Sequence, residues 1–210
     1  MSVGRVIRGS DCVAEGAKWL EARDEGMARA LLAIDEVPLR LRPDGFAQLL
    51  SAIVSQQVSV ASANAIWARV QAAGLNDPAR VAGADDEALR AVGLSRPKVR
   101  YARALAMAGI DYPALREMPS DEVIKTLVAV PGIGLWTAEI YAMFSLGRAD
   151  VFAPGDLALQ EAAKVLYGLK ERPKEKAFRE MALRWSPWRS VAARVLWAYY
   201  RVAKDREGIR

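Results

Sequence analysis

A four-residue break between two helical segments constrains the fold of this chain more than any other feature of its sequence. Apolar spacing predicts helices at 121–129 and 134–146, the first capped by Ser120 and the second ended by Gly147. Only Pro131–Gly134, Pro-Gly-Ile-Gly, lies between them, and proline cannot continue the first helix. Glycine adopts backbone angles closed to other residues and has no side chain to hold a ligand away. The amides of this turn can therefore converge on one anion, and a phosphate would fit there.

An isolated acid follows this turn further along the chain. Asp156 ends the run Phe152-Ala-Pro-Gly-Asp, and a helical pattern begins with it. Aspartate after Pro-Gly often caps a helix, so capping is one interpretation. The other is catalytic, because a carboxylate held beside a sugar can stabilise positive charge and orient or deprotonate an attacking water. The residue pattern alone leaves both interpretations open.

Helical patterns cover nearly the whole chain, which predicts an all-α fold. Convincing alternating strands, internal repeats and long linkers are missing. Asp85 is expected to cap a helix, Pro97 to lie in a first turn, and Gly168 to end a helix. The predicted helices cover residues 12–22, 25–34, 45–54, 59–73, 86–92, 97–108, 121–129, 134–146, 156–167, 174–184 and 188–203.

Composition limits the chemistry that is open to the chain. The net charge of +5 would help it approach a polyanion, although many proteins with other partners are as basic. The single cysteine, Cys12, excludes a disulfide or a cysteine-ligated cluster within the chain, and the lack of histidine excludes histidine catalysis and the common zinc sites. No apolar run reaches membrane-spanning length and the N-terminal segment lacks the core of a secretion signal, so we expect a cytoplasmic protein.

Three separated stretches resemble the 3-methyladenine DNA glycosylase II family of the helix-hairpin-helix DNA glycosylases. They are Ala52–Ala63 (AIVSQQVSVASA), Pro131–Gln160 and Trp185–Trp197 (WSPWRSVAARVLW). A lone Pro-Gly-Ile-Gly would be weak evidence, whereas three blocks in this order make the match specific. The resemblance runs from about Phe46 to Tyr200.

The resemblance implies two helical subdomains with a DNA-binding cleft between them. A central subdomain would span 38–148 and contain the helix-hairpin-helix at 121–146, while 1–37 and 149–210 would form the other subdomain. The family's enterobacterial type carries an extra β-rich N-terminal domain, and this chain is expected to lack it. The glycosylases that resemble endonuclease III hold an iron–sulfur cluster on four cysteines, which this chain cannot do.

The resemblance also implies a monofunctional enzyme that excises alkylated purines, of the 3-methyladenine and 7-methylguanine type, in base excision repair. Asp156 matches the family's catalytic aspartate. Relatives that also nick the strand carry a Schiff-base lysine two residues after the second hairpin glycine. Trp136 stands there instead, and an indole cannot be that nucleophile. The implied partner is double-stranded DNA with alkylated bases, bound by a monomer at the bacterial nucleoid with no membrane and no required cofactor.

Aromatic side chains should line the base pocket, because alkylated purines carry positive charge and stack on electron-rich rings. Trp197 matches the family's stacking tryptophan, and Trp136 and Tyr141 are further pocket candidates. Tyr141 stands one residue beyond the position where relatives carry a tyrosine. Each of these aromatic residues, and likewise Trp188, could instead belong to the core of an apolar helix.

Gln57 matches the residue with which the family fills the gap left by an extruded nucleotide, and a solvated or capping glutamine is the open alternative. By the same resemblance, a monovalent cation, Na or K, would bridge the hairpin and a phosphate through the backbone carbonyls of Val128, Val130 and Ile133. The remaining residues expected to contact DNA are Gly132, Ile133, Gly134, Thr137 and Lys98.

Two other functions remain open on the sequence. The same scaffold could act on another damaged or deaminated base, since residues of the pocket wall decide the substrate. The chain could also be a noncatalytic helix-hairpin-helix module that contacts phosphates only. Such a module would need neither Asp156 nor a tryptophan pocket, which makes it the weaker hypothesis.

Overall fold

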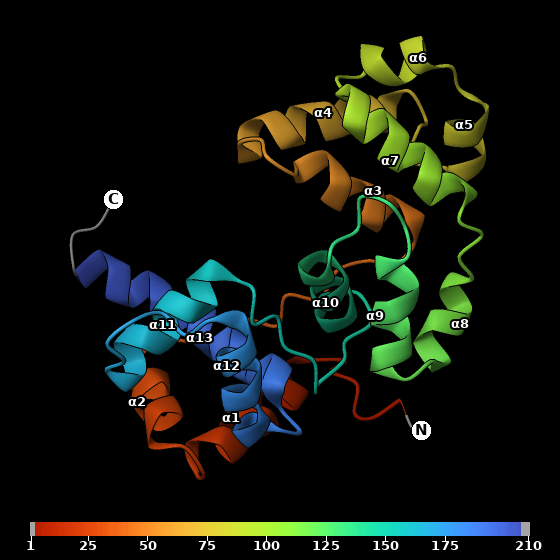
Figure 1. Ribbon diagram of the computed structural model, residues 1–210. Helices are drawn as coiled ribbons and strands as arrows, with labels where there is room; N and C mark the ends of the chain where they lie inside the picture. The colour runs from red at the N-terminus through yellow and green to blue at the C-terminus, as the bar shows by residue number, and fades with distance from the viewer. Residues whose placement is uncertain (1–2, 207–210) are drawn as a thin grey trace. The chain divides into compact units, whose positions relative to one another are not determined.

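The chain folds into helices joined by short connections, as Figure 1 shows. The computed structural model describes the backbone of residues 3–206 and the side chains of residues 3–204. Within that part of the chain there are 13 α-helices and one 3-10 helix, and the only β pairing is an isolated bridge between Val6 and Arg148. The all-α prediction is confirmed. None of these helices has the length and apolar character needed to cross a lipid bilayer.

Contacts between residues divide the chain into two units. The first comprises the described residues of Met1–Leu41 and Ala142–Arg210, and the second is Arg42–Tyr141. The resemblance predicted 38–148 for a central subdomain. The observed boundary after Tyr141 falls inside α10 (Leu135–Phe144), so this helix contributes residues to both units.

In the first unit the C-terminal helix packs against more of the neighbouring helices than any other element does. Its residues 190–196 are all buried, because neighbouring helices cover it on several sides. The helices of this unit are α1 (Ser10–Glu21), α2 (Glu25–Ala33), α11 (Leu157–Tyr167), α12 (Glu175–Met181), the 3-10 helix η1 (Ala182–Trp185) and α13 (Arg189–Arg206). Of these, α1, α2 and α11 pack directly against α13. The positions of the buried α13 side chains are therefore set by the core of this unit.

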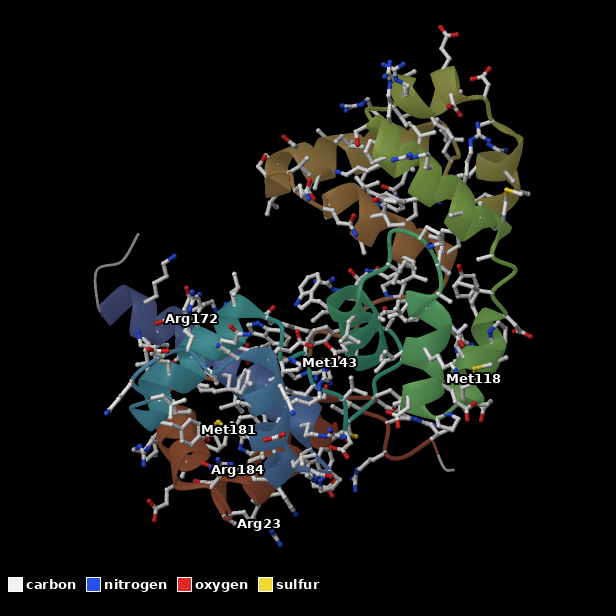
Figure 2. All side chains as sticks on the ribbon, in the orientation of Figure 1. Arg23, Met118, Met143, Arg172, Met181 and Arg184 are labelled. Carbon is white, nitrogen blue, oxygen red and sulfur yellow. The ribbon has the colours of Figure 1, made fainter. Side chains whose placement is uncertain are left out.

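Asp24 joins three elements of the first unit. Its Oδ1 accepts hydrogen bonds from the Met27 N–H at 3.0 Å and the Tyr167 hydroxyl at 2.8 Å, and its Oδ2 accepts one from the Trp185 indole N–H at 3.0 Å. Arg184, labelled in Figure 2, lies 3.9 Å from the same Oδ2. Burial acts to raise the pKa of Asp24, but these hydrogen bonds together outweigh it, so the pKa lies below its ordinary value.

In the second unit α7 is central and packs against α3, α5 and α6. The helices of this unit are α3 (Phe46–Ser55), α4 (Val60–Ala72), α5 (Pro78–Gly83), α6 (Asp86–Ala91), α7 (Arg96–Met107), α8 (Tyr112–Glu117), α9 (Ser120–Val128) and the first part of α10. The sequence predicted neither α5 nor α8. Each is only 6 residues long, which is too short for an apolar repeat to be recognised.

Most of the predicted helix boundaries are confirmed. Asp85 accepts an N–H from the first turn of α6, Pro97 lies in the first turn of α7, and Gly168 ends α11 with a left-handed backbone at φ 63°. The predicted cap at Ser120 is wrong. Helix α9 begins at Ser120 itself, with Pro119 at the capping position and no side-chain cap. The predicted helix 174–184 divides into α12 and η1.

Replacing Asp24 with asparagine should lower the free energy of unfolding at neutral pH by about 2–4 kcal/mol, because the amide NH2 cannot accept from the buried donors around it. Since the folded-state pKa of Asp24 is lowered, the stability from its charge is present above the unfolded-state pKa near 3.8 and is lost as the pH falls through the lower folded-state value. The difference between wild type and variant should therefore shrink at about pH 3. Urea unfolding of wild type and variant, at neutral pH and at about pH 3, measures this difference.

The exposed Asp35, changed to asparagine, is the matched control for loss of one surface charge. Its effect on the free energy of unfolding should stay within about 0.5 kcal/mol at either pH. An Asp24 variant whose deficit is the same at neutral and at acid pH would contradict the assigned role of the carboxylate charge.

Candidate functional site

The turn between α9 and α10 has the geometry that its glycines predicted. Gly132 has φ 93°, and a Cβ added there would lie 2.4 Å from Cγ of Tyr101 on α7, so both the backbone angle and the space require glycine. Ile133 is buried, and its N–H donates to the carbonyl of Val130 at 3.0 Å. Gly134 is exposed, and the space beside its Cα is open. The buried side chain of Ile133 therefore anchors the turn, while Gly134, directly before α10, faces solvent.

A second turn, between α3 and α4, is tied to the first. The Gln56 side-chain Nε2 donates to the carbonyl of Gly132 at 2.9 Å. The next residue, Gln57, is exposed and has φ 56°, a left-handed conformation that a non-glycine residue rarely adopts. Val58 and Val60 beside it are exposed as well. The structure thus presents Gln57 on a strained turn held against the hairpin, and the tether by Gln56 was not predicted.

Lys98 stabilises the end of α3, from which this second turn departs. Its side chain is only 8% exposed, and Nζ donates to the carbonyl of Val54 at 2.7 Å, in the last turn of α3. Burial lowers the pKa of Lys98. The sequence predicted a DNA contact for Lys98, and this placement does not agree with it, because the ammonium is used inside the protein. A cation at a helix C-terminus is favourable for the helix dipole.

Three predicted site residues lie on α10, in different surroundings. Trp136 is 47% exposed and Thr137 is buried. Tyr141 is 3% exposed, its hydroxyl oxygen accepts the Gly45 N–H at 2.8 Å, and burial raises its pKa to about 12. A place in the base pocket was predicted for Tyr141. Its burial and its bond to the start of α3 make it a core residue of the second unit instead.

Asp156 and Trp197 meet in the first unit. One oxygen of Asp156, Oδ1, accepts the N–H of Leu159 at 3.0 Å and the indole N–H of Trp197 at 3.1 Å. The first bond caps α11, so the capping interpretation is confirmed. The second joins α11 to α13 through the two residues that the sequence predicted separately. Asp156 remains partly exposed, so its carboxylate is held in one orientation and still reaches solvent.

The indole of Trp197 has two further neighbours in the first unit. The Phe144 ring lies 5.6 Å from it at a tilt of 37°, and the guanidinium of Arg40 lies 5.9 Å from its ring centroid. Phe144 is buried and Arg40 is exposed. Nothing in the local sequence pointed to Arg40. Trp188, by contrast, is buried, as the core interpretation of that residue predicted.

Comparisons with known proteins confirm the resemblance seen in the sequence. The family described as HhH-GPD superfamily base excision DNA repair protein matches residues 50–187. A crystal structure of DNA-3-methyladenine glycosidase from Bacillus halodurans is 37% identical with a TM-score of 0.80, and covers 88% of this chain and 88% of its own.

Two further relatives are similar over most of this chain. The 3-methyladenine DNA glycosylase of Schizosaccharomyces pombe, solved in complex with abasic DNA, is 28% identical with a TM-score of 0.75 over 87% of this chain and 95% of its own. DNA-3-methyladenine glycosylase 2 of Escherichia coli is 35% identical over 73% of this chain, and this chain spans 57% of that protein.

Replacing Gln57 with glycine should raise the free energy of unfolding by about 0.5–1 kcal/mol, because glycine adopts the left-handed conformation without a Cβ penalty. The matched control is Gln71→Gly, at an exposed position in the last turn of the helical α4. That change should lower the free energy of unfolding by about the same amount. Urea unfolding compares the two. Destabilisation by both changes would contradict the strain assigned to Gln57.

Proposed function

The chain belongs to the HhH-GPD superfamily of base excision DNA repair proteins, and we propose that it is a monofunctional DNA glycosylase that releases alkylated purines of the 3-methyladenine and 7-methylguanine type. The observation that carries the proposal is the hydrogen bond from Trp197 to Asp156. A module that only binds phosphates has no use for a partly exposed carboxylate oriented by an aromatic side chain. The names of the relatives support the choice of substrate.

DNA is held by the two turns of the second unit. The exposed Gly134 directly precedes α10, and backbone amides at a helix N-terminus suit a phosphate. Gln57, presented on its strained turn, enters the space that an extruded nucleotide leaves in the stack. Extrusion is required because the target bond is out of reach inside a duplex. The partner is thus double-stranded DNA with an alkylated base, bound by one copy of the chain.

Asp156 acts on the sugar of the extruded nucleotide. The bond between base and C1′ breaks with its electron pair going to the base, which leaves positive charge on the sugar. The carboxylate stabilises that charge and accepts a proton from the water that attacks C1′. The products are the free base and an abasic sugar. Since Trp136 stands where strand-nicking relatives carry lysine, water is the nucleophile and the strand stays intact.

A monovalent cation at the hairpin is a further part of this proposal. The carbonyls of Val128, Val130 and Ile133 would hold it, and its positive charge would attract a DNA phosphate. The Val130 carbonyl already accepts the Ile133 N–H, and a carbonyl oxygen has a second lone pair, so the residues fit such an ion. Oxygen ligands suit Na and K, and the described residues contain no group of three or more acidic, histidine or cysteine side chains that could hold a metal ion.

Asp156→Asn should reduce the release of 3-methyladenine and 7-methylguanine from methylated DNA by about 10²–10⁴-fold, because the amide carries no charge and takes no proton. Asparagine is as good a helix cap as aspartate, so α11 and DNA binding should be preserved. Single-turnover base release and the Kd for a duplex with an abasic site measure the two effects.

The matched control is Asp85→Asn, which changes an aspartate that caps α6 as Asp156 caps α11, by accepting the N–H three residues further on. It should leave base release within about twofold, as expected of a surface change. Near-wild-type turnover by the Asp156 variant would remove this residue from the mechanism. A covalent adduct of the wild type with DNA, trapped by borohydride, would contradict the monofunctional part of the proposal.

Lys98→Met tests whether this lysine supports the turn or contacts DNA. Loss of the charged partner of the Val54 carbonyl should lower the free energy of unfolding by about 1–3 kcal/mol. DNA binding should weaken through the displaced turn, with no change in the slope of log K against log salt, because no phosphate contact is lost. Arg96→Met, an exposed cation on the same helix, is the matched charge control. A slope reduced by about one for Lys98→Met would assign it to a phosphate.

A further inference from the structure

A groove, which we call the α1 groove, runs along one face of α1 in the first unit. Its volume is about 530 Å³, and its second wall is formed by Leu31, near the end of α2, and by residues 34–37 that follow this helix. The α1 wall consists of Ser10, Val13, Ala14, Ala17, Lys18 and Glu21. These positions are related by steps of three and four, so they share one face of the helix. The groove follows α1 over about 16 Å, the length of about three helical turns.

Apolar side chains form the inside of the α1 groove. Val13 is buried at its floor, and Leu31, Ile34 and Val37 on the second wall are partly exposed. Ala14 is exposed, and its small side chain leaves room for the backbone of another helix to approach α1 closely. Apolar side chains of a partner that cover this surface remove it from water, which favours association.

Four exposed, charged side chains line the α1 groove, and three of them are acidic. Glu21, Asp35 and Glu36 stand against Lys18 alone, so three negative charges and one positive charge give the lining a net charge of −2. The chain as a whole carries +5. Among the side chains that the structure describes, none forms an ion pair with the three carboxylates. The groove therefore attracts lysine and arginine and repels a DNA phosphate, in contrast to the charge of the whole chain.

The α1 groove is separate from the proposed catalytic residues. None of the residues that line it belongs to α11 or α13, the two helices that the bond between Trp197 and Asp156 joins. Sites for small molecules hold a few polar groups that converge on the ligand inside an apolar pocket. The charged groups of this groove are instead exposed, beside an apolar inside that extends over three helical turns. This arrangement suits a segment of a protein better than a small molecule.

We propose that the α1 groove is a docking site for an amphipathic helix of a partner protein, one that carries lysine or arginine beside its apolar face. The apolar side chains of that helix enter between α1 and residues 34–37, which is the helix-in-groove mode of recognition. Its cations lie against Glu21, Asp35 and Glu36. This inference goes beyond the proposed function, because it requires neither a flipped base nor the carboxylate of Asp156.

Two synthetic helical peptides of about 12 residues test the proposal. Both carry leucine along one face, and the flanks of that face are lysine in one peptide and glutamate in the other. Fluorescence anisotropy of the labelled peptides gives the Kd for the whole chain. The lysine peptide should bind about tenfold more tightly than its glutamate twin, although the net charge of the chain alone favours the opposite order.

Two variants connect this binding to the α1 groove. Ala14→Trp places a large side chain in the groove and should weaken binding of the lysine peptide by about tenfold or more. Glu21→Lys should weaken it by about threefold or more, because an attraction becomes a repulsion. The matched controls Ala177→Trp and Glu180→Lys lie at exposed positions of α12 in the same unit, outside the groove, and should leave the Kd within about twofold of the wild-type value.

Urea unfolding and base release from methylated DNA show whether Ala14→Trp is folded, and both should stay close to wild type. Equal binding of the two peptides by the wild type would overturn the proposal. So would equal weakening of the lysine peptide by Ala14→Trp and Ala177→Trp. Sedimentation that finds a dimer of the wild type and a monomer of Ala14→Trp would also overturn it, by assigning the groove to a second copy of the chain.

Discussion

The hydrogen bond between the Trp197 indole and the Asp156 carboxylate is the contact on which the candidate site depends. A carboxylate on a solvated surface turns freely between rotamers, and fixing it costs conformational entropy. Here one oxygen meets two N–H donors, one from the first turn of α11 and one from α13. Because α13 is packed by α1, α2 and α11, Trp197 cannot move without disturbing the core of the first unit. The orientation of a partly exposed acid is thus set by apolar packing.

The second unit fixes its exposed groups by a different means. Its two turns hold each other, because Gln56 donates to the hairpin carbonyl of Gly132. Lys98 secures the end of α3, from which the first turn departs. Beside these contacts Gln57 is exposed and is held in a conformation that costs energy. Strain of this kind persists only where the surroundings impose it, and it is found often at binding sites.

Local sequence patterns predicted most of the helices and their ends. They could not predict contacts between residues that are distant in the sequence. The cap at Asp85 and the stop at Gly168 depend on neighbours within one helical turn, so residue type alone indicates them. The burial of Lys98 depends on Val54 and that of Tyr141 on the start of α3, both distant in sequence. The sequence around Lys98 and Tyr141 gave no indication of these partners. Arg40 had no signal either, since the ring beside its guanidinium, that of Trp197, is distant in the sequence.

Two aspartates of the first unit share one arrangement and differ in exposure. Asp24 and Asp156 each cap a helix, and each accepts the indole N–H of a tryptophan from further along the chain. The side chain of Asp24 is 8% exposed and takes the Tyr167 hydroxyl as well, so its acceptor sites serve the fold. Asp156 is partly exposed and can meet water. Capping and catalysis are therefore not competing explanations of Asp156. The cap and the indole orient the carboxylate, and its exposure leaves it open to the chemistry that we propose.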